Sequence, residues 1–160
     1  MNTTAQPSPE NPEELLQALI TQMRSTPEGA AALQRLEPEQ IDTDYAVAWE
    51  ALDQGDMMRA TDLFADLAQR VPDQHRIHFG FGLCLQHFGL ARDAARHYGY
   101  AFVLDPSSAA CAFRMGECLA HLGDRDAARE AYTTAVELCA IEGNAPEIRD
   151  FALQALDELR

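Results

Sequence analysis

Residues 89–106 read GLARDAARHYGYAFVLDP, and the spacing of a few residues in this stretch decides the fold. Gly89 is followed five residues later by Ala94 and four further on by the aromatic Tyr98, and the stretch ends at Pro106. The same order recurs 34 residues before and 34 residues after it. The upstream copy has Gly55, Ala60 and Phe64, and the downstream copy has Gly123, Ala128 and Tyr132.

A 34-residue period with these landmarks is typical of the tetratricopeptide repeat, a pair of helices joined by a tight turn. A proline closes the first two copies, at Pro72 and Pro106, whereas the third has Ala140 at that position. The pattern predicts an all-α solenoid of three repeats, at 41–74, 75–108 and 109–142. Such units must stack to bury their apolar faces, and stacking creates a concave groove that binds another chain.

Three segments flank the predicted repeats. Residues 1–11 are polar and proline-rich without apolar periodicity, which predicts a disordered tail. Residues 12–40 hold two short helical patterns. Residues 143–160 carry an amphipathic stripe that predicts a capping helix on the third repeat. The stripe consists of Ile148, Phe151, Ala152, Ala155, Leu156 and Leu159.

The first of the two N-terminal patterns has an apolar face whose burial partner the sequence leaves open. Either this face caps the solenoid or it mediates self-association of two chains. Its members are Leu15, Leu16, Leu19, Ile20 and Met23.

Composition excludes several classes of partner. The 160 residues carry 26 acids against 12 bases, a formal charge of -14. Because phosphate backbones and anionic membranes repel such a chain, we expect no nucleic-acid partner and no stable membrane association. No apolar run approaches the ~20 residues of a membrane span, and the N-terminus lacks the features of a secretory signal, so we expect a cytoplasmic protein.

The cysteines and histidines do not form a recognisable metal site. Cys84 and Cys118 occupy matched positions in successive repeats, which favours small buried thiols in the core. No CxxC or HExxH spacing is present. Nucleophile elbows, phosphate-binding loops and dinucleotide-binding glycine patterns are missing as well, so we expect no enzyme, no metal and no cofactor.

The small residues Ala48, Gly82 and Gly116 occupy one matched position in the predicted first helices and are assigned to the core. One face of each of these helices is then left over. Large apolar side chains dominate this face, and a patch of this kind is typical of an interaction surface. The alternative is that the side chains only pack against neighbouring repeats or against an N-terminal segment folded back into the groove. The predicted groove residues are Tyr45, Trp49, Leu52, Phe79, Leu83, Gln86 and Phe113, and Arg76 and Gln86 could orient the backbone of a bound peptide.

Three strings are more specific than repeats in general: YAVAWEALDQGD at 45–56, HFGFGLCLQHFGLARDAARHYGYAFVLDP at 78–106 and FRMGECLAHLGDRDAA at 113–128. Together they resemble the class II chaperones of bacterial type III secretion systems, the family of the Yersinia translocator chaperone. The shared features are Tyr45, the GxGxC motif at 80–84, the pair Tyr98 and Tyr100, and the triplet at 117–119.

The resemblance implies a cytoplasmic chaperone that holds hydrophobic translocator proteins before secretion and keeps them apart. Members of the family bind an extended translocator segment in the concave groove, commonly with a P-x-L-x-x-P motif. Tyr45 and Trp49 correspond to the first two groove aromatics of the family and Leu52 to the third, and Trp49 and Leu52 replace the usual tyrosines. The resemblance also implies a homodimer formed through the N-terminal helices. Two alternatives stay open, a repeat adaptor that scaffolds a complex and a regulatory partner of a transcription factor.

Overall fold

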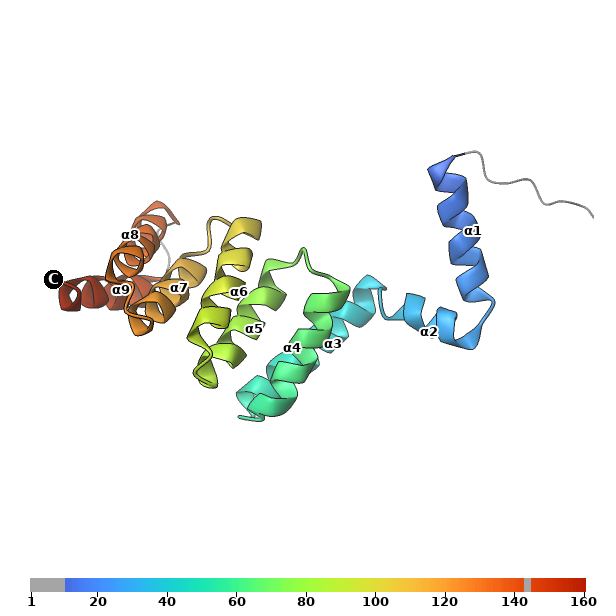
Figure 1. Ribbon diagram of the computed structural model, residues 1–160, viewed down its shortest axis with the longest axis horizontal. Helices are drawn as coiled ribbons and strands as arrows, with labels where there is room; N and C mark the ends of the chain where they lie inside the picture. The colour runs from blue at the N-terminus through green and yellow to red at the C-terminus, as the bar shows by residue number, and fades with distance from the viewer. Residues whose placement is uncertain (1–10, 143–144) are drawn as a thin grey trace, which may run out of the picture. The chain divides into compact units, whose positions relative to one another are not determined.

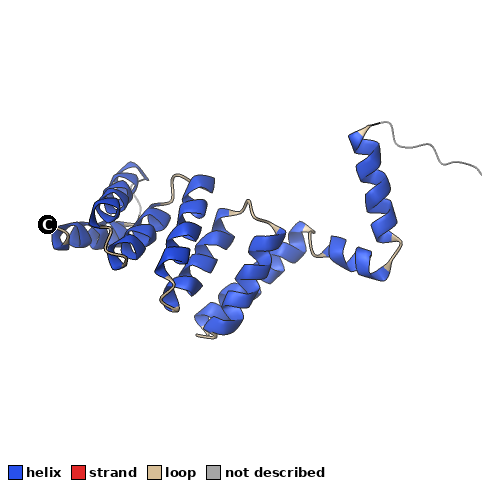
Figure 2. Cartoon of the chain, in the orientation of Figure 1, coloured by secondary structure: helices blue, strands red, loops and turns tan. Residues whose placement is uncertain are grey.

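A computed structural model describes residues 11–142 and 145–160, and every element in these ranges is a helix (Figure 2). The chain falls into two compact units, one that reaches to Asp42 and one from Thr43 to Arg160. The helices are α1 (Pro12–Arg24), α2 (Pro27–Gln34), α3 (Pro38–Asp53), α4 (Met57–Arg70), α5 (His75–His87), α6 (Ala91–Leu104), α7 (Ala109–His121), α8 (Arg125–Glu142) and α9 (Pro146–Glu158).

The first unit holds α1, α2 and the start of α3. Asn11 caps α1, because its Oδ1 accepts a hydrogen bond from the N–H of Glu14 at 2.8 Å, and Thr26 caps α2 in the same way. α2 ends at Gln34, and Pro38 begins α3, a position that proline tolerates because the first turn needs no N–H. Residues 1–10 of the predicted disordered tail lie outside the described residues.

The second unit is a row of helices in which each packs on the next along the chain, from α4 to α9 (Figure 1). The pairs α3/α4, α5/α6 and α7/α8 are the three repeats. In the first pair, Tyr45 and Trp49 of α3 both contact the ring of Phe64 on α4 edge to face. Asp44 of α3 also forms an ion pair with Arg70 of α4.

The turn inside each repeat has one repeated geometry. Gly55, Gly89 and Gly123 all have positive φ, between 73° and 83°. The residue after each glycine donates its N–H five residues back, to Ala51, Leu85 and Leu119. These bonds satisfy carbonyls at the end of the first helix, as in a Schellman motif, and the left-handed conformation explains why glycine recurs there.

Small residues in the first helices receive rings from the second helices. A Cβ added at Gly82 would lie 2.6 Å from the Tyr98 ring, and one at Gly116 would lie 2.7 Å from the Tyr132 ring. Tyr98 and Tyr132 are buried. The four cysteines are also buried and free, and burial raises the thiol pKa of Cys84 and Cys111, and that of Cys118 to about 11.

Prolines explain the lengths of the second helices. α4 and α6 each have 14 residues and end two residues before Pro72 and Pro106, whereas α8, with Ala140 at the matching position, continues for 18 residues. α9 then packs on α8 and α7. Ala152 of α9 and Leu159, which directly follows α9, belong to the same buried cluster as Tyr132, and Arg129 donates to the carbonyl of Leu159 at 2.7 Å.

The predicted fold class is therefore confirmed: an all-α tetratricopeptide-repeat solenoid of three repeats with N-terminal helices and a C-terminal capping helix. The finer division into 1–11, 12–40, 41–142 and 143–160 stays a prediction.

Candidate functional site

The seven side chains assigned to the groove from the sequence lie on the first helices of the three repeats. All seven are partly exposed, and none is fully buried. A side chain shows this intermediate exposure when one side packs on the core and the other faces solvent. α3 contributes Tyr45, Trp49 and Leu52, α5 contributes Phe79, Leu83 and Gln86, and α7 contributes Phe113.

Each groove aromatic is held by the buried ring of its own repeat. Phe79 packs on Tyr98 with ring centroids 5.7 Å apart, and Phe113 packs on Tyr132 at 5.6 Å. Tyr45 and Trp49 make the equivalent contacts with Phe64, at 6.1 and 5.9 Å. One side of each ring therefore packs on the core, and the other side is exposed. The two hypotheses for these side chains, core packing and an interaction surface, each describe one side of the ring.

Two pockets follow the stripe and share two lining residues. The first, of about 170 Å³, lies between Tyr45 and Phe79 and is also lined by His75, Arg76, Ser108 and Ala110. The second, of about 300 Å³, lies between Phe79 and Phe113 and is also lined by Ala110, Arg114, Glu147, Ile148 and Phe151. Because Phe79 and Ala110 border both, the pockets are neighbours along the stripe. Trp49, Leu52 and Leu83 line neither pocket.

α9 contributes a wall that the sequence analysis missed. Phe151 was expected in the buried stripe of the capping helix, but it is 59% exposed. Its ring lies 6.4 Å from that of Phe113 and lines the second pocket together with Ile148. A signal was present in the sequence, since Phe151 adjoins Ala152 and only one of two adjacent helical residues can face the core squarely.

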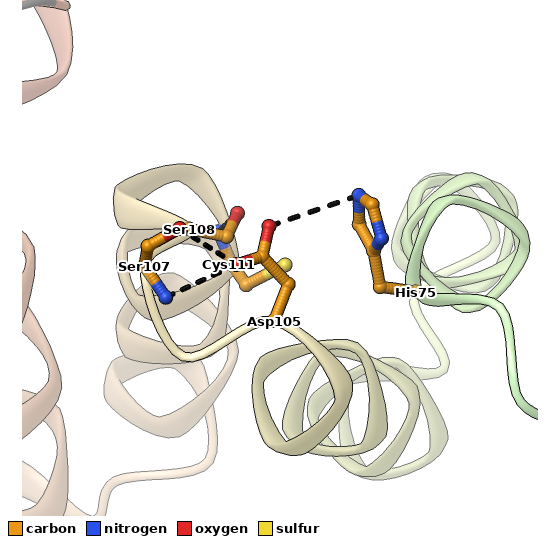
Figure 3. A network of polar contacts seen from close by, with 5 residues as sticks. All are labelled: His75, Asp105, Ser107, Ser108 and Cys111. Atoms are coloured by element: carbon orange, nitrogen blue, oxygen red, sulfur yellow. Dashed lines mark hydrogen bonds and ion pairs between the residues drawn. The ribbon is translucent and has the colours of Figure 1, made fainter.

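A polar network holds the rim of the first pocket (Figure 3). Ser108 caps α7 by accepting a hydrogen bond from the N–H of Cys111. Asp105 accepts hydrogen bonds from the hydroxyl and the N–H of Ser107, at 2.6 and 3.1 Å, and its other oxygen lies 3.8 Å from Nε2 of His75. The Ser107 hydroxyl, more than His75, lowers the pKa of Asp105. His75 and Ser108 are thereby positioned from two successive repeats.

Arg76 covers part of this pocket. Its guanidinium lies 4.5 Å from the centre of the Tyr45 ring, a cation–π contact, and its Nε donates to Oε1 of Gln74 at 3.0 Å.

The opposite ends of α5 and α7 are polar. The Tyr98 hydroxyl donates to Oε1 of Gln86 at 2.8 Å, and Nε2 of Gln86 donates to Glu117 at 3.2 Å. Arg114 also donates to Glu117, at 2.9 Å. Burial, more than any neighbouring charge, raises the pKa of Tyr98, so its hydroxyl stays a donor. Gln86 therefore lines a separate pocket of about 260 Å³ with its amide already engaged.

The predicted dimerisation stripe lies on α1 and is largely exposed. Leu15, Leu16, Leu19 and Met23 are 40–57% exposed, and Ile20 is partly exposed. Within the described part of the chain, no helix is long and apolar enough to span a membrane. Over the same residues, no three His, Cys, Asp or Glu side chains gather as metal ligands would.

Comparison with known proteins agrees with this architecture. The tetratricopeptide-repeat family model matches residues 88–140. A type III secretion complex from Aeromonas hydrophila has a TM-score of 0.76 at 24% identity, with 81% of this chain and 86% of that chain covered. PcrH of Pseudomonas aeruginosa, solved with the chaperone-binding region of PopD, has a TM-score of 0.74 at 24% identity, covering 77% and 92%.

A third structure is the Yersinia enterocolitica chaperone SycD in complex with a peptide of the translocator YopD. Its TM-score is 0.70 at 25% identity, with 77% of this chain and 94% of that chain covered. No curated protein matches the sequence. The resemblance read from the sequence is confirmed: the chain has the fold of a tetratricopeptide-repeat protein and resembles the class II translocator chaperones of type III secretion.

Proposed function

We propose that this protein is a cytoplasmic bacterial chaperone that binds hydrophobic type III secretion translocators through its concave groove. It keeps them soluble and apart before export. The observation that carries the proposal is the pair of neighbouring pockets along the aromatic stripe, which share Phe79 and Ala110. Structural neighbours solved with peptides of YopD and with the chaperone-binding regions of PopD and PopB support it.

The dimensions of the pockets favour an extended segment as the ligand. At about 170 and 300 Å³ the two pockets lie below and at the lower limit of the ~300–1,000 Å³ that encloses a drug-sized molecule, so each suits a group of the size of an apolar side chain. An extended peptide can place one side chain in each pocket. Because the aromatic walls are already held by the core, little side-chain freedom is lost on binding.

The chaperone activity follows from burial and charge. Apolar segments of a translocator that lie in the groove are removed from water and from one another. The charge of -14 keeps the complex soluble through repulsion between complexes. Binding and release need no nucleotide in this scheme, and competition at the export apparatus would drive release.

We also propose that the protein is a homodimer that associates through the α1 stripe. The exposure of four of its five apolar side chains supports this, and SycD has been solved in an alternative dimer.

The test is calorimetric titration with an extended peptide that bears a P-x-L-x-x-P motif, compared with a scrambled peptide. We expect saturable binding that Phe79→Ala weakens at least tenfold, because Phe79 borders both pockets. Phe88→Ala is the matched control, since Phe88 is an exposed phenylalanine outside the groove. Thermal melts establish that both variants are folded.

Two outcomes would redirect the proposal. If Phe79→Ala and Phe88→Ala bind the peptide equally well, the groove is not the binding site. If the peptide does not bind and the wild-type protein does not keep a translocator in solution, the repeat adaptor is the better hypothesis.

A further inference from the structure

The second pocket has a wall that belongs to none of the three repeats. α9 supplies three of the side chains that line it, Glu147, Ile148 and Phe151. These positions share one face of the helix, because residues i, i+1 and i+4 lie close together around the helix axis. Phe151 contacts Phe113 of α7, with ring centroids 6.4 Å apart and the ring planes tilted by 35°. The capping helix therefore completes a pocket of about 300 Å³.

The other face of α9 fixes the helix in this place. Ala152 is fully buried in the cluster around Tyr132, and Arg129 of α8 donates to the carbonyl of Leu159, the residue after α9. Phe151, the neighbour of Ala152, is nevertheless 59% exposed. A ring that a packed helix already holds beside a pocket offers contact area to a ligand at little cost in side-chain entropy.

The pocket also carries one carboxylate without a partner. Arg114, the arginine in the lining, already donates to Glu117 at 2.9 Å. Glu147 is exposed, and within the described part of the chain its carboxylate forms no hydrogen bond or ion pair. Asp150, the next acid along α9, pairs with Arg149. Glu147 therefore gives the pocket a net negative charge beside walls that are mostly apolar.

We propose that the second pocket binds a basic side chain, Lys or Arg, of the bound segment, and that Glu147 and Phe151 of α9 select it. The inference rests on the proposed function, because the basic side chain belongs to an extended chain in the groove. Lys and Arg combine an apolar stem with a charged end. The stem packs on the apolar walls and the charged end pairs with Glu147, while the face of an aromatic ring also attracts a cation.

Other side chains suit this lining less well. An acidic side chain would be repelled by Glu147 and would find Arg114 already paired. A purely apolar side chain would fill the pocket but would displace water from the Glu147 carboxylate, which costs free energy when no partner replaces the water. The first pocket differs, because it has Arg76 and no acid among its described lining residues. The two pockets therefore favour different side chains and give the bound segment a direction.

Calorimetric titration of the full chain tests the proposal with a set of P-x-L-x-x-P peptides. Each of the three x positions is replaced in turn by lysine and by norleucine, which has a similar straight stem without the charge. At one position we expect lysine to bind about fivefold more tightly than norleucine, the upper end of what a partly exposed ion pair contributes. The difference should shrink at high salt, because salt screens exposed charges.

Two variants separate Glu147 from the overall charge of -14, which attracts any basic peptide. In Glu147→Gln, the preference for lysine at that position should disappear. Asp157→Asn removes the same charge from the far end of α9, roughly 15 Å along the helix, and should keep the preference. An equal preference for lysine at all three positions, or the same preference in Glu147→Gln and the wild type, would overturn the proposal.

A second pair of variants tests the aromatic wall. Phe151→Ala should weaken the binding of the lysine and norleucine peptides alike, by roughly three- to tenfold, because a contact surface of the pocket is lost. Leu153→Ala is the matched control, since Leu153 is also exposed and lies on the opposite side of α9. Thermal melts establish that both variants are folded. If Phe151→Ala binds both peptides as tightly as the wild type, α9 is not part of the site.

The outcomes also separate this inference from the proposed function. If the norleucine peptides bind and lysine gives no advantage at any position, the segment lies in the groove and the inference alone is wrong. If none of the peptides binds, the proposed function and the inference fail together.

Discussion

At the scale of single residues, glycines in the first helices leave room for an aromatic ring from the second helix of the same repeat. Gly82 is buried beneath Tyr98, whose hydroxyl donates a hydrogen bond to Oε1 of Gln86. Because Gly82 has no Cβ, the Tyr98 ring can lie against α5, and the Tyr98 hydroxyl then orients the amide of Gln86. Gly99 on α6 is also a helical glycine, but its added Cβ would meet only Met115 Sδ at 3.9 Å.

These two glycines should respond in opposite ways to the same substitution. We expect Gly82→Ala to lower the free energy of unfolding by about 1–3 kcal/mol, because the Tyr98 ring must move. We expect Gly99→Ala to raise it by roughly 0.5–1 kcal/mol, because alanine is the better helix former and its methyl group fits. Urea denaturation of both variants measures the difference. An increase in the free energy of unfolding of Gly82→Ala would contradict the close contact between Gly82 and the Tyr98 ring.

Residue-level features differ in how well the sequence predicts them. The ring and glycine positions could be predicted because they recur every 34 residues, and a periodic signal identifies them three times. The burial of Trp49 Nε1 without a hydrogen-bond acceptor could not be predicted, because it depends on the direction of one side chain. The sequence indicated that Trp49 lies on the groove face, but nothing in it indicates whether an acceptor is within reach.

At the scale of elements, a pair of histidines, the buried His78 and the partly buried His97, joins α5 to α6. His78 Nε2 donates to the carbonyl of Pro72 at 2.7 Å, so in its neutral form Nδ1 is left as an acceptor. His97 Nδ1 lies 3.0 Å from that atom and must be the donor. Protonation of His97 adds a proton at Nε2 and so places a positive charge in a partly buried site beside Arg96. Burial first, and then His78 and Arg96, lower the pKa of His97 to about 4.

This pair should make the repeats sensitive to mild acid. Because the unfolded chain takes up the His97 proton near pH 6.5 and the fold resists it down to about 4, stability is lost as the pH falls through that window. We expect a loss of about 1–2 kcal/mol between pH 7 and pH 5 from this group, after allowance for partial exposure. Denaturation at both pH values measures it.

The matched variants are His97→Gln, which keeps a donor without titrating in this range, and His87→Gln at an exposed histidine. His97→Gln should lose less stability than the wild type between the two pH values, and His87→Gln should behave as the wild type does. An unchanged pH dependence in His97→Gln would show that His97 is not the group responsible.

For α9, the sequence predicted the helix and its apolar face but not all the contacts of that face. Its amphipathic stripe predicted a helix that covers the third repeat, and Ala152 and Leu159 are indeed buried there. The position of Phe151 at the wall of the second pocket was missed, because apolar periodicity shows which face of a helix is apolar but not which residues at the edge of that face are covered. Which part of that face is covered depends on the angle at which α9 crosses α7 and α8.

At the scale of the whole molecule, the proposed binding site and the proposed dimer contact lie in different units of the chain. The repeats from Thr43 onward hold the proposed groove, and the unit before them holds an apolar stripe on α1 that its own residues leave exposed. Leu16, at 57% exposed, is the most open member of the stripe. Thr21 lies on the opposite side of the same helix and is exposed as well.

If the stripe is the dimer contact, a charge placed in it should separate the chains without unfolding the repeats. We expect Leu16→Glu to change the mass measured by light scattering from that of two chains to that of one, because a buried unpaired carboxylate opposes association. The main melting transition should stay in place, and Thr21→Glu, which adds the same charge on the other face, should remain dimeric. Were the stripe a cap on the solenoid instead, Leu16→Glu would lower the melting temperature and leave the mass unchanged. A wild-type protein with the mass of one chain would show that self-association through α1 is wrong.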